Sequence, residues 1–427
     1  MTAPEIVAPG KVGWRARLKR ATLELDALAL TMSTGVTALL GLAYWTIAAR
    51  GFPMAEVGRA SAIVSAATAL ATVSNLSLGG MYERFLPVSG RDTRRYLLRG
   101  GLATAALALL LGSGFLLLGP TERLFVHPWE WVGFPVLVIT LAQFALLDNT
   151  LIGLRRARWA AVKNIAHAVA KLALAAGAAA LMLIGGESLV LAWSAPALLL
   201  VILYLPAVWK HCGAPTLMKA APSLPPVREL ASYFGTSVGI MVVGASAPLV
   251  IPLIVVDRLG AELNAAFTMA WTLFSALALL LGTVLGPYIA QASAPGANAR
   301  RLTLRFAAIL SALAVFGALF LWFGAPVVLG LLGERYASET ESLVRLMALS
   351  MPLSVVGILY AGVARVTRRL KLAMVMQVLT TVLVVGGVVL IIDRFGLNGI
   401  GYSYLVVEAV AAAILAVPTW RTIRRMT

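Results

Sequence analysis

The sequence has little charge, one cysteine and few histidines, and each scarcity excludes a class of protein. Only 12% of its 427 residues are charged, whereas a soluble domain carries about 25%. Hydrophobic residues make up 60% of the chain, and the mean hydropathy is +0.90. Cys212 has no second cysteine to pair with, and three histidines are too few to suggest a metal cluster. The composition therefore predicts a polytopic membrane protein.

The motifs of common enzymes are also missing. The chain has no Gly-x-x-x-x-Gly-Lys-Ser/Thr phosphate loop, so ATP hydrolysis is not expected and coupling would come from an ion gradient or the membrane potential. It has no His-Glu-x-x-His motif, and no Ser-His-Asp set or paired carboxylates stand outside the apolar runs. The longest outer loops, at 120–131 and 324–342, are too short for an enzyme domain. We expect no enzyme activity, no metal and no cofactor.

Long apolar runs bounded by charge predict twelve membrane spans, since a helix that crosses a bilayer needs about 20 apolar residues. The predicted spans are 27–49, 60–82, 98–119, 132–153, 160–184, 188–209, 230–255, 264–290, 303–323, 343–364, 372–392 and 397–419. They form two lobes joined by a Pro-containing linker. The predicted units are a basic segment (1–26), an N-lobe (27–209), the linker (210–228), a C-lobe (229–419) and a basic tail (420–427).

The basic residues fix the orientation. Of 35 Lys and Arg residues, 27 fall in loops on one side of the predicted membrane and seven on the other, with Lys171 inside a span. Cytoplasmic loops carry the excess of positive charge, so both termini should be cytoplasmic. The net charge of +17 is not a sign of nucleic-acid binding, because it lies in short loops between apolar runs. The first 26 residues lack the apolar core of a cleavable signal peptide.

The two lobes share a sequence repeat at an offset of about 206 residues. Ala55-Glu56-Val57 matches Ala261-Glu262-Leu263, Gly80-Met81-Tyr82 matches Gly286-Pro287-Tyr288, and Arg94-Arg95 matches Arg300-Arg301. Each copy contains six spans, an even number, so both copies enter the membrane in the same direction. We therefore expect two parallel six-helix repeats related by a pseudo-twofold axis along the membrane normal, as in transporters that rock two bundles around a central site.

The first outer loop carries a family resemblance. Residues 49–58 run Ala-Arg-Gly-Phe-Pro-Met-Ala-Glu-Val-Gly, and the second span ends in Leu-Gly-Gly-Met-Tyr at 78–82 before a basic loop. The arrangement resembles the polysaccharide-flippase (Wzx-like) branch of the multidrug/oligosaccharidyl-lipid/polysaccharide (MOP) exporter superfamily, although Val57 stands where that branch usually has an aromatic residue.

The resemblance implies a flippase that works by alternating access. Its expected cargo is a polyprenyl-pyrophosphate-linked oligosaccharide used to build cell-surface polysaccharide at the cytoplasmic membrane. The expected partners are this lipid-linked glycan, membrane lipids, and polysaccharide polymerase and glycosyltransferase machinery, with no nucleic acid.

Three alternatives stay open. The first is a MATE-like cation-coupled drug or metabolite antiporter, and the second is a non-transport membrane enzyme or assembly scaffold. The third is a major-facilitator carrier, whose Asp-Arg-x-Gly-Arg loop is missing here. The first span has no carboxylate between Asp26 and Arg50, which favours the flippase over a cation-coupled antiporter.

Ionisable side chains at membrane depth are costly, so each one is a functional candidate. Lys171 lies 12 residues beyond Trp159, or roughly 18 Å along the fifth span at 1.5 Å per residue. Asn164, His167 and Lys171 share one face of that helix. A lysine ammonium suits a phosphate as a point charge, so Lys171 and Asn164 are candidate cargo contacts.

Five further residues complete the candidate set. Asp148 with His167, and separately Glu408, are candidates for coupling to a proton or another cation, while Arg50 and Arg258 are candidates for receiving the phosphate at the outer face. Each has a structural alternative. Asp148 could form a polar clamp with Asn164 and His167, Glu408 could bond to Tyr402 or Tyr404, and the two arginines could be snorkelling anchors.

Overall fold

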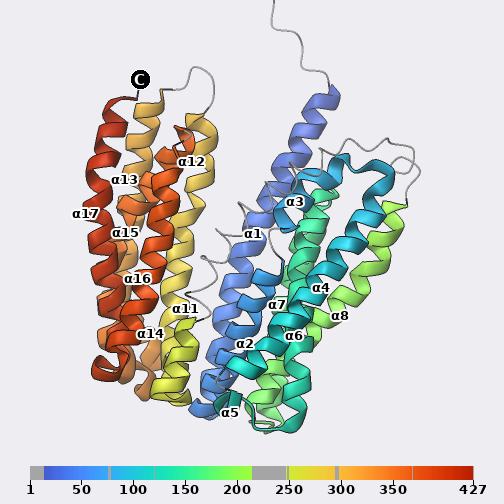
Figure 1. Cartoon of the computed structure of the whole chain (residues 1–427), viewed down its shortest axis with the longest axis vertical. Helices are drawn as coiled ribbons and strands as arrows, with labels where there is room; N and C mark the ends of the chain where they lie inside the picture. The colour runs from blue at the N-terminus through green and yellow to red at the C-terminus, as the bar shows by residue number, and fades with distance from the viewer. Residues whose placement is uncertain are drawn as a thin grey trace, which may run out of the picture.

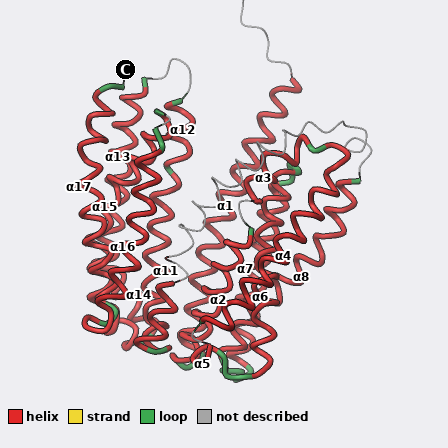
Figure 2. Tube along the Cα trace, in the orientation of Figure 1, coloured by secondary structure: helices red, strands yellow, loops and turns green. Residues whose placement is uncertain are grey.

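The computed structural model describes residues 14–75, 78–119, 121–213, 247, 250–293, 298–367 and 369–426. Throughout these residues the chain forms helices, turns and short connections, with no strand (Figures 1 and 2). Ten helices of the described part are long and apolar enough to cross a membrane. The predicted all-α polytopic class is confirmed.

The first lobe contains helices α1 to α8. Their bounds are α1 Trp14–Gly51, α2 Met54–Ser74, α3 Leu78–Phe85, α4 Thr93–Leu118, α5 Thr121–Leu124, α6 Pro128–Gly153, α7 Ala157–Ala180 and α8 Gly186–Cys212. Two short 3₁₀ turns, Leu86–Val88 and Gly90–Asp92, connect α3 to α4.

The second lobe contains α11 to α17. Their bounds are α11 Ala261–Thr283, α12 Leu285–Ala292, α13 Ala299–Leu319, α14 Ala325–Leu332, α15 Glu334–Val366, α16 Lys371–Phe395 and α17 Asn398–Arg424. Residues 250–259 are also helical and precede α11.

The predicted spans overlap these helices, but the count of twelve stays a prediction, because α7 is not among the ten apolar helices of the described part. The second predicted span, 60–82, is two helices, because α2 ends at Ser74 and α3 begins at Leu78. The predicted outer loop 324–342 is wrong, since it is helical apart from Gly333, whose φ of 155° and extended ψ separate α14 from α15. The predicted span 230–255 and the linker lie mostly outside the described residues, whereas the predicted N-terminal segment is helical from Trp14 onward as the beginning of α1.

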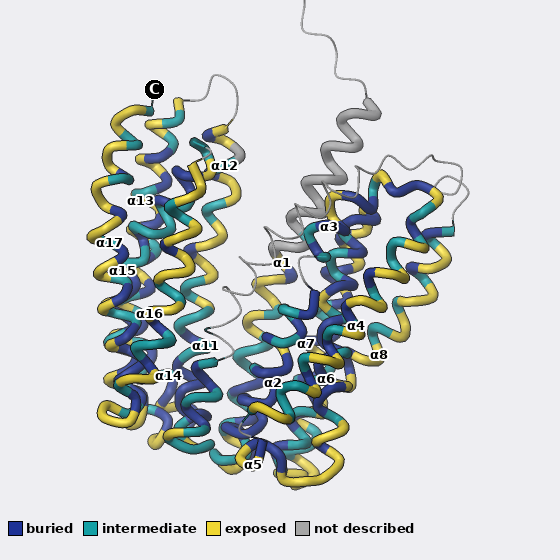
Figure 3. The backbone as a smooth tube through the Cα atoms, in the orientation of Figure 1, coloured by how far each residue is buried: buried dark blue, intermediate teal, exposed yellow. Residues whose placement is uncertain are grey.

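The two lobes are separate bundles that converge at one end (Figure 1). The beginning of α1 and the end of α17 both lie at the opposite end, where the bundles are apart. Buried residues fill the inside of each bundle and the region where the lobes meet, while exposed residues cover the outward faces (Figure 3). The first described helix thus begins on the side where the last one ends, as the even number of predicted spans requires. That this side is cytoplasmic stays a prediction, and the converging end is called the outer end below on that basis.

The sequence repeat has a structural counterpart in two buried tyrosines. Tyr82 donates a hydrogen bond to the Leu97 carbonyl (3.1 Å), and the Tyr288 hydroxyl lies 2.8 Å from that of Thr303. Both pairs lie at the offset of 206, so in each copy the end of the second helix is fastened to the start of the third. Gly100 leaves room for Tyr82, whereas Phe306 at the same offset stacks on Tyr288 at 4.2 Å.

Candidate functional site

Helix α7 buries a basic face in the interior of the first lobe. Lys163, His167 and Lys171 recur every four residues and are 0%, 8% and 6% exposed. Because residues four apart lie above one another on a helix, the three side chains form one buried row. They contact α1, α6 and α8.

Lys163 is paired with Asp148. Its Nζ lies 3.2 Å from Asp148 Oδ1, donates to the Phe144 carbonyl (3.0 Å) and lies 3.0 Å from the centre of the Phe144 ring. Asn164 donates to the same carboxylate oxygen of Asp148 (3.2 Å). A buried ammonium needs an anion and hydrogen bonds to offset its lost hydration, and Lys163 has both.

Lys171 is surrounded by aromatic rings instead. Its Nζ lies 3.4 Å from the centre of the Trp193 ring and 5.4 Å from that of Tyr44. Tyr44 packs edge-on against both Trp45 and Trp193. Within the described residues no carboxylate forms an ion pair with Lys171. An ammonium over aromatic faces is stabilised by their quadrupoles, and it keeps its charge available for another anion.

The aromatic pocket of Lys171, formed by Tyr44, Trp45 and Trp193, borders the region where the lobes meet. Tyr44 and Trp45 belong to a buried cluster that continues into Phe267 and Met269 of α11. The pocket is therefore close to the interface between the two lobes, where they would move relative to each other during transport.

His167 does not join Asp148 as expected. Its Nε2 lies 2.9 Å from the Trp193 carbonyl and its ring lies 4.8 Å from that of Phe144. Lys163 sits one turn closer to Asp148 and takes that carboxylate. The expected clamp is thus half right, since Asn164 takes part and His167 does not.

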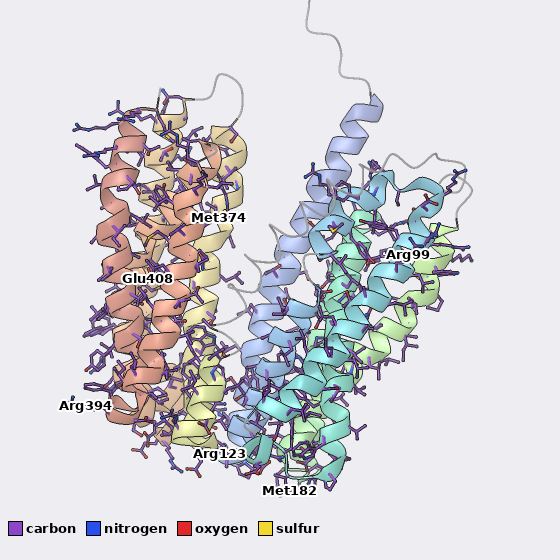
Figure 4. The ribbon with its side chains drawn as sticks, in the orientation of Figure 1. Arg99, Arg123, Met182, Met374, Arg394 and Glu408 are labelled. Atoms are coloured by element: carbon purple, nitrogen blue, oxygen red, sulfur yellow. The ribbon has the colours of Figure 1, made fainter. Side chains whose placement is uncertain are left out.

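Glu408 lies midway along α17 in the other lobe (Figure 4). It borders a cavity of about 180 Å³ whose walls include Ser354, Tyr360, Gln377 and Thr380. No hydrogen bond or ion pair of Glu408 is found among the described residues, so the expected bond to Tyr402 or Tyr404 is not formed. A carboxylate beside a polar cavity in a membrane helix is able to exchange a proton or hold a cation.

Arg50 and Arg258 both have protein partners. Arg50 at the end of α1 donates twice to the Leu331 carbonyl of α14 (2.7 and 3.1 Å), linking the lobes. Arg258 pairs with Asp393 of α16 (2.5 Å) and with its neighbour Asp257 (3.5 Å). These contacts within the protein are neither of the two expected roles, and both snorkelling and a role in receiving phosphate stay predictions.

At the outer end of the first lobe, one buried arginine forms ion pairs with three glutamates. The sequence did not predict this cluster. Arg59, 6% exposed, binds Glu56 (2.5 Å), Glu130 (3.1 Å) and Glu187 (3.0 Å), which come from α2, α6 and α8. Arg59 is one of the seven basic residues that the sequence assigns to the outer side. Its three partners lie 3, 71 and 128 residues away, and only the first spacing is visible in the sequence.

The lobes contact each other through α2 and α11. Asn264 donates to the Gly58 carbonyl (2.8 Å) and to Ser61 (3.0 Å), and Thr268 lies 2.9 Å from Ser61. Gly58 and Asn264 are separated by 206 residues, so equivalent positions of the two copies meet, as they do at a twofold axis. At the same end, Arg123 pairs with Asp257 (3.7 Å).

The Lys163–Asp148 pair supports one stability prediction. Asp148→Asn leaves a buried ammonium without an anion, which costs about 3–5 kcal/mol. We expect a lower unfolding midpoint in detergent, measured by intrinsic fluorescence, and recovery of much of the loss when Lys163→Met is added. Equal midpoints for the wild type and Asp148→Asn would contradict the pairing.

Comparisons with known proteins bear on the fold. No family model and no curated protein matches the sequence. The solved inward-facing structure of a multidrug resistance MATE family transporter of the MOP superfamily has a TM-score of 0.63 at 16% identity, over 93% of this chain and 98% of that one. The MATE multidrug transporter DinF-BH gives 0.64 at 14%, over 95% and 97%. A MOP superfamily transporter from Pyrococcus furiosus, described as having a binding pocket of reverse polarity that suggests a different function, gives 0.59 at 14%, over 95% and 96%.

The chain has the fold of the MOP superfamily transporters. These neighbours are transporters rather than enzymes, in line with the expected absence of catalysis. At such identities the likeness establishes the fold and not the cargo, so membership of the polysaccharide-flippase branch stays a prediction.

Proposed function

We propose that this protein transports an anionic amphiphile across the cytoplasmic membrane by alternating access, and that the cargo is a polyprenyl-pyrophosphate-linked oligosaccharide. The observation that carries the proposal is Lys171, a buried ammonium in an aromatic pocket without a carboxylate partner among the described residues. The expected link to polysaccharide polymerase and glycosyltransferase machinery follows from this cargo.

The charge of the buried row on α7 supports an anionic cargo, while at the outer end of the same lobe three glutamates surround Arg59. The row on α7 brings two ammonium groups against one carboxylate, Asp148, which Lys163 already neutralises. An excess positive charge in a low-dielectric region attracts anions and repels cationic drugs. The aromatic walls suit a cargo that also carries apolar or sugar surface.

The arrangement of the lobes supports alternating access. The contacts between α2 and α11 and between Arg50 and Leu331 lie at the outer end, while the bundles are apart at the end that carries the termini (Figure 1). With the predicted orientation, these contacts hold the lobes together at the outer face, which alternating access requires of a state that loads a lipid-linked cargo from the cytoplasm.

A cation-coupled antiporter is the second candidate, and the fold neighbours named above, several of them multidrug transporters, favour it. Glu408 is the observation in this chain that fits it, because an unpaired carboxylate beside a polar cavity is suited to taking up a proton. The two candidates differ in cargo charge, and Glu408 could couple either one to a gradient.

Reconstitution in liposomes separates the candidates. We expect a polyprenyl-pyrophosphate glycan to co-purify with the wild type and a labelled analogue to reach the opposite leaflet, and we expect no proton-driven uptake of a cationic dye. Glu408→Gln should abolish any response of the rate to an imposed pH gradient, while Glu122→Gln, an exposed control on α5, should not. Dye transport driven by a pH gradient, with no glycan lipid bound, would overturn the anionic cargo and leave the antiporter.

A further inference from the structure

A cavity on the first lobe opens sideways, away from the second lobe. It lies between α4, α6 and α8, which Figure 1 shows on the far side of the N-lobe, and has a volume of about 340 Å³. Three of its lining residues, Leu98, Leu102 and Leu205, are more than half exposed at 53%, 61% and 59%. Their exposed side chains face where the bilayer would be, so the cavity opens to lipid.

The walls of this lateral cavity are suited to an apolar occupant. Most lining side chains are hydrocarbon, and the polar ones are already bonded within the protein. Gln143 donates to the Gly101 carbonyl (2.9 Å), Thr150 to the Leu146 carbonyl (2.8 Å) and Tyr82 to that of Leu97. A water needs only about 10–15 Å³ of such space but also needs two to four polar partners. The cavity has the room and lacks the partners.

The end of the lateral cavity nearest the chain termini is basic. Arg94 donates to the Trp209 carbonyl (3.0 Å) and lies 5.0 Å over its ring, and Trp209 lines the cavity. Arg95 and Arg99 follow on α4, and Arg99 is labelled on this lobe in Figure 4. One carboxylate, Asp92, precedes them. None of the three arginines forms an ion pair within the described part of the chain. Basic side chains beside an apolar slot match a lipid with an anionic headgroup.

We propose that the lateral cavity binds one chain of an anionic phospholipid from the cytoplasmic leaflet, with its phosphate at Arg94. The apolar walls take the acyl chain, and the guanidinium, held in place by Trp209, takes the headgroup. The site lies on the opposite face of the lobe from α1 and α2, so it is separate from the Lys171 pocket. The proposal does not depend on the identity of the transported cargo.

Native mass spectrometry with added phosphatidylglycerol or phosphatidylcholine tests this site. Gly101 lines the cavity, and a Cβ there would meet only Gln143 Oε1, at 3.7 Å. The Cβ of a larger residue therefore fits at this position, and Gly101→Leu is expected to fill part of the cavity. Losing several buried methylene contacts should lower phosphatidylglycerol binding by more than about tenfold. Arg94→Gln should lower it by about fivefold, and should abolish the preference over phosphatidylcholine.

Gly114→Leu is the matched control, because it lies on the same helix with nothing within 4 Å of its Cβ position and away from the cavity. We expect it to bind phosphatidylglycerol like the wild type. Equal binding by Gly101→Leu and Gly114→Leu would overturn the site, and equal binding of the two lipids by the wild type would overturn the headgroup assignment. Retention of an isoprenoid lipid that Gly101→Leu removes would show that the occupant is cargo and not phospholipid.

Discussion

Lys171→Met is expected to abolish most transport while leaving the fold intact. Methionine has nearly the same length and packs well against aromatic rings, so the pocket of Tyr44 and Trp193 stays filled. What is lost is the charge. A hydrogen bond to a charged group contributes about 1.5–3 kcal/mol, which corresponds to roughly 10- to 150-fold weaker cargo binding. The measurement is cargo retention and translocation in the reconstituted system.

Two variants make the result specific to a buried charge. Lys171→Arg retains a cation and should keep part of the activity, and Lys210→Met removes an exposed cation from the end of α8 and should keep all of it. Wild-type transport by Lys171→Met would remove the main support for an anionic cargo. A loss shared by Lys210→Met would point to general charge effects at the membrane surface instead.

The sequence located Lys171 because it stands deep in an apolar run, where charge is costly and easy to notice. Lys163 is one of the 27 basic residues that the sequence assigns to the side of the termini, because it stands close to Arg155, Arg156 and Arg158, although the predicted span 160–184 contains it. In the structure α7 begins at Ala157, so Lys163 lies two turns inside the helix and is fully buried. Its role depends on α6, because nothing in the local sequence shows that Asp148 faces it across the helix contact.

Contacts between distant helices were beyond the sequence. The fold class and the ends of most helices followed from local apolar runs and charge. The partner of Arg59 on α8 and the position of His167 against Trp193 depend on how α2, α7 and α8 pack, and one sequence carries no direct record of that packing. The repeat was a partial exception, because an offset of 206 predicts that equivalent positions near an axis meet, and Gly58 and Asn264 do so.

That contact gives the second large expected effect, on the balance between conformations. A Cβ on Gly58 would lie 1.7 Å from the Ala261 carbonyl oxygen and 3.0 Å from the Ala265 nitrogen. Both atoms belong to the backbone of α11, so no side chain can rotate away. Gly58→Ala must therefore separate α2 from α11 where the lobes close the outer end. Such overpacking costs about 1–3 kcal/mol. If the protein alternates between two states as proposed, this cost raises the free energy of the outer-closed state alone.

We expect Gly58→Ala to shift the ratio of outer-open to outer-closed molecules by roughly 5- to 150-fold. Spin labels attached at Glu122→Cys and Glu339→Cys, which are exposed on α5 and α15, report the distance between the lobes by double electron–electron resonance spectroscopy. The buried Cys212 is first replaced by Ser so that it is not labelled. Gly282→Ala on the same α11 meets nothing within 4 Å and should leave the distance distribution unchanged. If Gly58→Ala also left the distance distribution unchanged, the α2–α11 contact would not control the closure of the outer side. A longer distance in Gly58→Ala alone would make the Gly58–Asn264 contact the closure of the outer side, because a single methyl group at the repeat axis would then control which face is open.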